Sequence, residues 1–173
     1  MNESLNGRQI LVTGADGFIG SHLVEHLVRA GARVRAMVYY NSWNERGWLR
    51  DTPTEVQRQV ELVNGDIRDG EFVAKAVSGC EYVFHLSSLI AIPYSYEATR
   101  SYVDTNVTGA LNVLVACRRN DALTRLLHVS TSEVYGTAQV VPIPEHHPLV
   151  GQSPYAATKI AADKLAESFH RSF

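Results

Sequence analysis

The chain has 173 residues, of which 45% are hydrophobic and 20% charged, so it can bury the core of one ordinary globular domain. Its formal net charge of −2 gives no electrostatic reason for binding nucleic acid or an anionic membrane surface. Two isolated cysteines, Cys80 and Cys117, exclude a disulfide framework and a cysteine-based zinc site, and they predict buried free thiols.

Strand-like apolar runs alternate with helical patterns along the whole chain, which is typical of a parallel α/β sheet. Strands are predicted at residues 9–14, 33–39, 59–66, 80–87 and 125–131, and helices at 18–31, 69–79, 97–119 and 153–170. Ser153 is the expected N-cap of the last helix, with Pro154 in its first turn. Two connections, 40–54 and 136–152, are longer than such a fold needs, and long loops in compact domains are often functional. The pattern predicts a doubly wound parallel sheet.

A glycine run joins the first predicted strand to the first predicted helix. Gly14, Gly17 and Gly20 form a G-x-x-G-x-x-G pattern there. Glycine allows a tight turn and lets a pyrophosphate approach the backbone, while the helix N-terminus offers free N–H groups. The alternative is a plain tight turn, but the strand–turn–helix context favours dinucleotide binding.

The ends of the second and third strands bear on which dinucleotide binds. An acid at the end of the second strand selects NAD, and a base there accommodates NADP, but residues 38–42 contain neither. Asn41 and Ser42 are candidates for bonding a ribose hydroxyl, and Arg46 is either a phosphate ligand or a surface residue. After the third strand, Asp66 either accepts a hydrogen bond from adenine or caps a helix, whereas Asp69 is expected to cap.

Tyr155 and Lys159 are four residues apart on the last predicted helix, and therefore share one face of it. A nearby ammonium lowers the cost of forming a phenolate, so this tyrosine is suited to act as a base near neutral pH. Thr131, at the end of the fifth strand, completes a candidate catalytic set. The alternative is an exposed tyrosine beside a solvated lysine.

The motifs VTGADGFIGSHL, GDIRD, VFHLSS, DTNVTGALNVL, STSEVYG and SPYAATK occur in the order and spacing of the extended short-chain dehydrogenases/reductases, and the chain resembles that superfamily over essentially its whole length. One departure is HLSS, where the family usually has HLAA. The resemblance implies a Rossmann-like fold, a nucleotide-sugar substrate and a set of site residues. The implied site residues are Gly14, Gly17, Phe18, Ile19 and Gly20 at the pyrophosphate, Asp66 and Ile67 at adenine, and Leu86, Ser87 and Ser88 along the cofactor cleft. Asn106 is implied to brace the long helix against the active site, and Thr131, Tyr155 and Lys159 are implied to act in catalysis.

The stretch Thr131-Ser132-Glu133 bears on the type of reaction. By the resemblance, simple 4-epimerases have small neutral residues after the Ser/Thr, whereas 4,6-dehydratases need a group that removes the C5 proton. Glu133 is the implied base, with Ser132 orienting a hydroxyl. The alternative for Glu133 is a strand-end carboxylate that pairs with a lysine or caps a turn.

Three longer stretches, after the second and fourth strands and before the last helix, are similar to dehydratases that act on UDP-N-acetylglucosamine for legionaminic-type sugars. This similarity favours NAD as cofactor, with NADP left open. UDP-glucuronate decarboxylases and nucleotide-sugar 4-epimerases are rival enzymes, and a non-catalytic NAD(H)-binding module is a rival of another class. His146 and His147 are expected on a loop surface, and no metal site is expected.

The resemblance also bears on domain organisation and partners. Residues 1–173 are expected to form a single dinucleotide-binding domain that lacks the family's usual C-terminal substrate lobe, so the chain by itself should bind NAD but turn over substrate poorly. No signal-peptide core or membrane-length apolar run is present, so a cytoplasmic location is expected. The expected partners are a nucleotide-sugar and a second copy of the chain in a homodimer, with no nucleic acid and no membrane.

Overall fold

The computed structural model describes residues 5–173; residues 1–4 of the predicted domain lie outside the described part. Its centre is a five-stranded parallel sheet in the order β3-β2-β1-β4-β5. The strands are β1 (Gln9–Thr13), β2 (Arg33–Tyr39), β3 (Glu61–Gly65), β4 (Tyr82–His85) and β5 (Arg125–His128). The predicted α/β class and all five predicted strands are confirmed.

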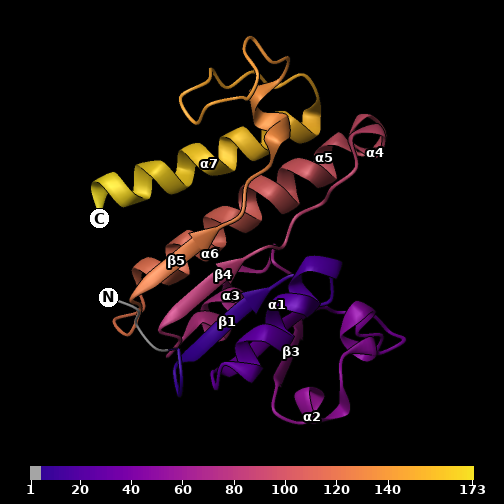
Figure 1. Cartoon of the computed structure of the whole chain (residues 1–173), viewed down its shortest axis with the longest axis vertical. Helices are drawn as coiled ribbons and strands as arrows, with labels where there is room; N and C mark the ends of the chain where they lie inside the picture. The colour runs from indigo at the N-terminus through magenta and orange to yellow at the C-terminus, as the bar shows by residue number, and fades with distance from the viewer. Residues whose placement is uncertain (1–4) are drawn as a thin grey trace.

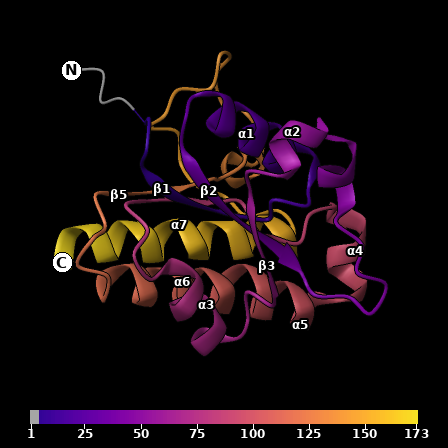
Figure 2. The ribbon, with the colours of Figure 1, turned by 90° about the horizontal axis from the view of Figure 1, so that it is seen from below.

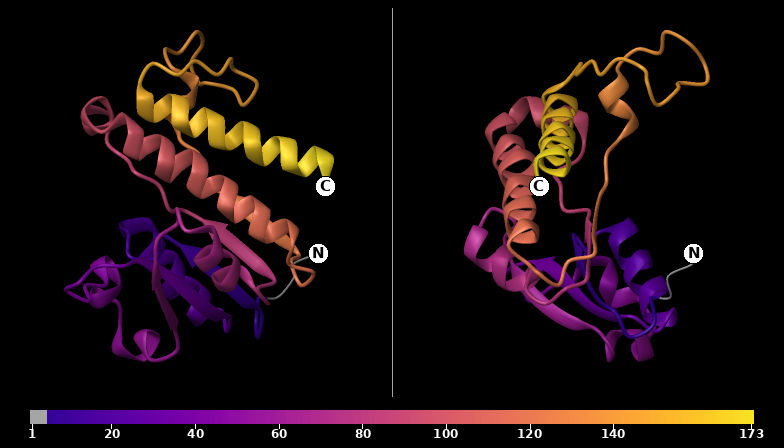
Figure 3. Two further views of the ribbon diagram at one scale, coloured as in Figure 1. Left: turned by 180° about the vertical axis from the view of Figure 1, so that it is seen from behind. Right: turned by 90° about the vertical axis from the view of Figure 1, so that its left-hand side faces the viewer.

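Helices cover both faces of the sheet (Figures 1 and 2). In chain order they are α1 (Phe18–Arg29), η1 (Gly47–Asp51), α2 (Thr54–Gln57), α3 (Gly70–Val77), α4 (Ile92–Glu97), α5 (Thr99–Tyr102), η2 (Val103–Thr108), α6 (Gly109–Arg118), η3 (Ser132–Tyr135) and α7 (Pro154–Ser172). One face carries α1 with η1 and α2, and the opposite face carries α3 and α6. The last helix, α7, packs along the side of α4, α5, η2 and α6 (Figure 3).

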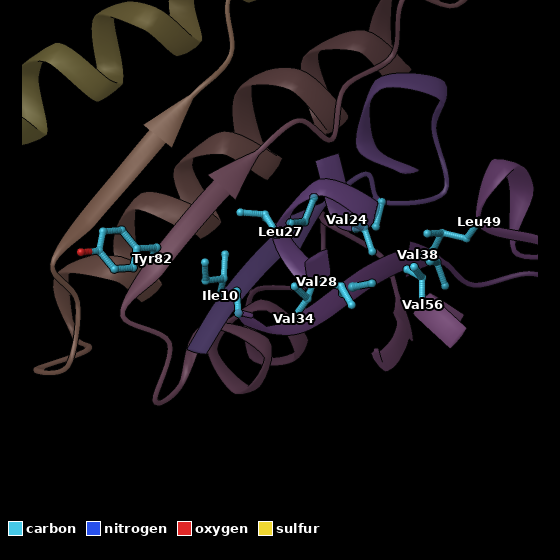
Figure 4. Packing of buried hydrophobic residues seen from close by; sticks show 13 residues of the cluster. Ile10, Val24, Leu27, Val28, Val34, Val38, Leu49, Val56 and Tyr82 are labelled. Carbon is cyan, nitrogen blue, oxygen red and sulfur yellow. The ribbon is translucent and has the colours of Figure 1, made fainter. Parts of the chain in front are cut away.

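The two faces follow from the alternation of side chains along each strand. Ile10 and Val12 of β1 join a cluster with Val24 and Leu27 of α1, and Figure 4 shows this cluster from close by. Leu11, between them, points to the other face and packs with residues of α3 and α6. A strand that is buried on both faces must be apolar along its buried centre, as Ile10, Leu11 and Val12 of β1 are.

Several local predictions are confirmed. The Asp69 side chain caps α3 by accepting hydrogen bonds from the backbone N–H of Glu71 and of Phe72, and Ser153 caps α7. Cys80 and Cys117 are buried free thiols. Burial raises the pKa of both and brings that of Cys117 to about 12, so neither is a ready nucleophile.

The helix predicted at 97–119 differs from a single regular helix. It breaks at Ala98, between α4 and α5, and its middle turn, η2, is π-helical. The wider turn shifts the register, so Val103 is 40% exposed whereas Asn106 is only 3% exposed. A periodicity of 3.6 residues places Val103 on the buried stripe, and the π turn explains why it is not there.

The two long connections also hold structure that periodicity did not predict. The first contains η1 and leads into α2, and Leu49 of η1 and Val56 of α2 are buried in the core. In the second, His146 is exposed as expected, but His147 is buried. Its Nε2 accepts a hydrogen bond from the backbone N–H of Gln139, and its Nδ1 lies 2.9 Å from the carbonyl of Pro148. The surface prediction for His147 was therefore wrong, because the ring ties its own loop together.

A buried polar contact joins the carboxyl ends of β1 and β4. The hydroxyl of Thr13 accepts hydrogen bonds from the backbone N–H of Leu86 and of Ser87, each at 3.1 Å. Because both lone pairs of the Thr13 oxygen accept these bonds, the Thr13 hydroxyl proton points to Nδ1 of His85, 2.8 Å away. That nitrogen must therefore be unprotonated. Burial, with His128 and Lys159 nearby, lowers the pKa of His85 to about 3.

Stability should therefore fall as the pH is lowered from neutral. An unfolded histidine takes up a proton near pH ~6.5, whereas native His85 stays neutral down to about 3, so the unfolded state binds more protons in this window. Between pH 7 and 5 the wild-type chain should lose about 2 kcal/mol more unfolding free energy than His85→Asn, whose amide oxygen replaces Nδ1 but does not titrate. Urea unfolding at the two pH values measures this, and equal losses would contradict the neutral buried histidine.

Candidate functional site

A cleft of about 890 Å³ runs along the carboxyl ends of the strands. It crosses the point between β1 and β4 where successive connections turn to opposite sides of the sheet, which is where ligands bind in open α/β sheets. Thirteen of the residues singled out in the sequence line it: Gly14, Gly17, Phe18, Ile19, Gly20, Asp66, Ile67, Leu86, Ser87, Ser88, Thr131, Tyr155 and Lys159.

The glycine loop is close-packed in a way that only glycine permits. Gly14 has φ +68°, and a Cβ there would lie 2.9 Å from the backbone nitrogen of Ser87. A Cβ on Gly20 would lie 2.1 Å from the carbonyl oxygen of Gly14. The loop can therefore lie flat against the end of β4, and the N-terminus of α1 faces the cleft beside it. This cradle fits a pyrophosphate.

At the third strand, the Asp66 carboxylate is held by Arg68. Nε of Arg68 donates to both oxygens, at 2.9 and 3.0 Å, and Nη2 donates to Oδ2 at 2.5 Å. Hydrogen bonds and charge from Arg68 outweigh burial and hold the pKa of Asp66 below its usual value. Both side chains line the cleft, and Ile67 between them is buried. Of the two sequence alternatives for Asp66, helix capping is wrong, since Asp69 caps α3.

Asn41 and Ser42, the predicted ribose contacts, are not among the residues that line the cleft. The Asn41 amide is used within its own loop, where it donates to the carbonyls of Tyr39 and Glu45 and accepts from the N–H of Glu45. Asp16 and Tyr39 line the cleft instead. The sequence signal for Asp16 lies inside the glycine run itself, where the aspartate precedes Gly17.

At the opposite end of the cleft, α7 presents Tyr155 and Lys159 beside Thr131. Tyr155 is 8% exposed and its ring packs edge-on against Tyr102, at 6.2 Å between centroids. The Lys159 ammonium donates a 2.7 Å hydrogen bond to the carbonyl of Val129, just beyond β5. Burial lowers the pKa of Lys159, and the carboxylate of Asp163 partly opposes that shift. Lys159 is thus a fixed, partly desolvated cation one turn of α7 after Tyr155.

A polar row that the sequence analysis missed runs behind this lysine. The parallel register aligns Thr13, His85 and His128 across three strands. His128 Nε2 lies 3.2 Å from Oδ1 of Asp163, at an angle too poor for a hydrogen bond, and Ser130 donates to Oδ2 at 2.5 Å. Burial raises the pKa of Asp163, but His128 and Ser130 outweigh it and hold that pKa below its usual value. The spacing of Asp163, one turn after Lys159, was the available signal.

Ser132 and Glu133 lie on η3, directly after Thr131, and both are exposed. The Thr131 hydroxyl accepts a 3.3 Å hydrogen bond from the backbone N–H of Glu133 and so fixes the start of this turn. Neither Ser132 nor Glu133 lines the cleft, so the structure places them beside it. Within residues 5–173 the Glu133 carboxylate makes no ion pair or hydrogen bond, which disfavours the alternative that it pairs with a lysine.

Asn106 lies behind the cleft rather than in it. Its Oδ1 accepts a 2.7 Å hydrogen bond from the N–H of Leu89, and its Nδ2 donates to the Leu89 carbonyl at 3.0 Å and to the Thr158 hydroxyl at 3.1 Å. One buried amide thus joins the loop after β4 to the helix that carries Tyr155 and Lys159. The bracing role that the resemblance implies for Asn106 stays a prediction, and these hydrogen bonds are the contacts on which it would depend.

Residues 5–173 hold neither a metal cluster nor a membrane-spanning helix. No group of three or more His, Cys, Asp or Glu side chains is arranged to hold a metal ion. In the same part of the chain, every helix is too short or too polar to cross a bilayer.

A parallel sheet in this order, with a glycine turn at its switch point, defines the Rossmann-like class of α/β proteins. Comparison with known proteins then gives the family. The family model described as GDP-mannose 4,6 dehydratase matches residues 11–173, and the chain belongs to this family of the extended short-chain dehydrogenases/reductases.

Its relatives process nucleotide-sugars. The chain is 36% identical over 167 residues to a dTDP-glucose 4,6-dehydratase of Streptomyces antibioticus, covering 94% of this chain and 49% of that protein. DesIV, a dTDP-glucose 4,6-dehydratase from Streptomyces venezuelae solved with NAD, matches with TM-score 0.84 and 32% identity over 95% of this chain and 52% of its own. A UDP-N-acetylglucosamine 4-epimerase from Methanobrevibacter ruminantium matches with TM-score 0.87 and 28% identity, covering 97% and 52%. The chain therefore spans about half the length of the relatives it matches.

The brace formed by Asn106 can be tested by its removal. Asn106→Ala leaves the N–H and carbonyl of Leu89 and the hydroxyl of Thr158 without their partner, and should lower the unfolding free energy by about 2–4 kcal/mol. Asn112→Ala, which removes one hydrogen bond to the carbonyl of Ile67, should cost only about 1 kcal/mol. Chemical denaturation measures both; a loss at Asn106 no greater than that at Asn112 would argue against the brace.

Proposed function

We propose that the cleft binds NAD and that the enzyme containing this chain is a nucleotide-sugar 4,6-dehydratase, with UDP-N-acetylglucosamine as its substrate. The observation that carries the proposal is that one cleft holds both the glycine loop and the Thr131, Tyr155 and Lys159 set. The family and the NAD-bound relative support the cofactor, and the UDP-N-acetylglucosamine 4-epimerase supports the sugar.

The residues present fit a dinucleotide along the whole cleft. The cradle at Gly14 and Gly20 would take the pyrophosphate, Asp66 and Ile67 would face adenine, and Ser87 would lie along the path to the catalytic end. When bound there, NAD supplies a hydride acceptor for sugar C4 and later a hydride donor for C6. The protein must hold the sugar still and move the protons.

Tyr155 would take the proton from the sugar 4-hydroxyl as C4 is oxidised. The Lys159 ammonium, one turn further along α7 and fixed by the Val129 carbonyl, would stabilise the negative charge that develops on the Tyr155 oxygen during the proton transfer. Thr131 would hold the same sugar hydroxyl by a hydrogen bond. The carboxylate of Asp163, one turn further along α7, balances the buried positive charge of Lys159.

The 4-ketone acidifies the proton on C5, and Glu133 would remove it. As the C5 proton passes to Glu133, the C6–O bond would break, and the departing hydroxide would take that proton from Glu133 and leave as water. Return of the hydride to C6 and uptake of one proton at C5, equal to the one that Tyr155 removed from the 4-hydroxyl, would complete the product. The Glu133 carboxylate suits this role because it has no partner in residues 5–173 and lies beside the cleft, two residues after Thr131.

A 4-epimerase is the second candidate, since the structurally similar UDP-N-acetylglucosamine 4-epimerase shares the first step. Oxidation at C4 followed by re-reduction there needs no C5 base. UDP-glucuronate decarboxylation also begins with the same oxidation. The role of Glu133 therefore separates the dehydratase from these two rivals.

Glu133→Gln separates these reactions. In the enzyme as its host makes it, this change should slow water loss from UDP-N-acetylglucosamine by about 10²–10⁴-fold, because the amide cannot accept the C5 proton. NADH should still form at 340 nm in a single turnover, because Tyr155 and Lys159 are intact. Glu145→Gln, an exposed carboxylate in the 136–152 loop, is the matched control and should behave as wild type.

Three outcomes would overturn parts of this proposal. Wild-type formation of a C4 epimer without water loss would make the protein an epimerase. Loss of NADH formation in Glu133→Gln would remove the separate C5-base role. A wild-type protein that binds NAD but never reduces it with any nucleotide-sugar would favour the non-catalytic module.

We further propose that the protein is a cytoplasmic homodimer, associating through the helical layer opposite α1. Tyr94, Tyr96, Val103 and Leu111 on α4, η2 and α6 are exposed apolar or aromatic residues on this layer. Sedimentation equilibrium of the 173-residue chain should give about twice its 19.1 kDa, and a mass of 19.1 kDa at micromolar concentration would contradict the dimer.

A further inference from the structure

Asp16 lies in the glycine loop, yet its carboxylate reaches across to the end of the second strand. Oδ2 accepts a 3.1 Å hydrogen bond from the backbone N–H of Tyr39, the last residue of β2. The Asp16 carbonyl accepts a 2.9 Å hydrogen bond from the N–H of Trp48. Asp16 is thus fixed once through its side chain and once through its backbone, with one carboxylate oxygen already used.

The second oxygen of Asp16 is available to a ligand. The side chain lines the cleft, and Oδ1 accepts no hydrogen bond from any residue of the described chain. Asp66 offers a contrast at the same end of the cleft, because both of its oxygens are held by Arg68. The Arg68 guanidinium, which lines this end of the cleft, is therefore already paired with the Asp66 carboxylate.

The position of this carboxylate matters because the end of the second strand is where such folds distinguish NAD from NADP. A carboxylate there bonds the 2′-hydroxyl of the adenosine ribose and repels a 2′-phosphate. β2 ends at Tyr39, and Tyr40 and Asn41 follow it, so the strand supplies no acid of its own. Asp16 brings a carboxylate to that place from the preceding loop.

We propose that Asp16 determines dinucleotide specificity: its free oxygen accepts the 2′-hydroxyl of NAD, and its charge excludes the 2′-phosphate of NADP. This inference rests on the proposed binding of a dinucleotide in the cleft. A phosphate monoester carries a charge of about −1.5 to −2 near pH 7, so placing it against Asp16 sets two anions together. With Arg68 already paired, the described part of the cleft offers that phosphate little compensation, and like charges brought together weaken binding by about 100-fold.

Asp16→Asn tests the charge without removing the fold contact, because an asparagine oxygen still accepts from the N–H of Tyr39. Isothermal titration of the 173-residue chain with NAD and with NADP gives both dissociation constants. Wild type should prefer NAD by about 100-fold or more, and Asp16→Asn should tighten NADP binding by about 10-fold while weakening NAD binding modestly. Glu45→Gln, the same change of charge on the loop after β2 but outside the cleft lining, should keep the wild-type ratio.

The outcomes separate this inference from the proposed function. Wild type that binds neither dinucleotide overturns both. Wild type that binds NAD and NADP equally, or an Asp16→Asn variant with an unchanged ratio, overturns the specificity role and leaves dinucleotide binding standing. If Asp16→Asn weakens both dinucleotides by the same factor, Asp16 only shapes the glycine loop.

Discussion

The cleft depends on the way one hydroxyl joins the ends of β1 and β4. Thr13 accepts the backbone N–H groups of Leu86 and Ser87 and donates to His85, so these two strand ends are fixed at the switch point of the sheet. The glycine loop can then lie directly against Ser87, with no room for a side chain at Gly14. The pyrophosphate cradle and the path to the catalytic end are both consequences of this junction.

The catalytic end continues the same row of polar side chains into α7. His85 and His128 are aligned on neighbouring strands, and Asp163 connects His128 and Ser130 to the turn of α7 that carries Lys159. Asp163 accepts a hydrogen bond from Ser130 and its other oxygen lies 3.2 Å from His128 Nε2, and these contacts restrict the position of α7 against the sheet. The buried amide of Asn106 restricts it from the other side through Thr158. The position of Tyr155 is thus set from two directions.

Much of this arrangement was predictable from the sequence because it follows from short-range rules. Alternating apolar runs gave the five strands, and the caps at Asp69 and Ser153 follow from local hydrogen bonding. What escaped prediction depends on contacts between distant segments. The π turn turns Asn106 inward, His147 is buried by its own loop, and Asp16 reaches Tyr39 across 23 residues of sequence. The Asn41 side chain, a candidate for a ribose hydroxyl by its place in the sequence, is instead hydrogen-bonded to Glu45 within its own loop.

Hydrogen–deuterium exchange of the 173-residue chain with and without saturating NAD tests the central claim, that the cleft at the strand ends is a dinucleotide site. The account predicts slower exchange in residues 14–20, 66–68, 86–89 and 129–131, with the 136–152 loop as an internal reference that changes little. Unchanged exchange in these segments, or protection confined to surfaces outside the cleft, would contradict it.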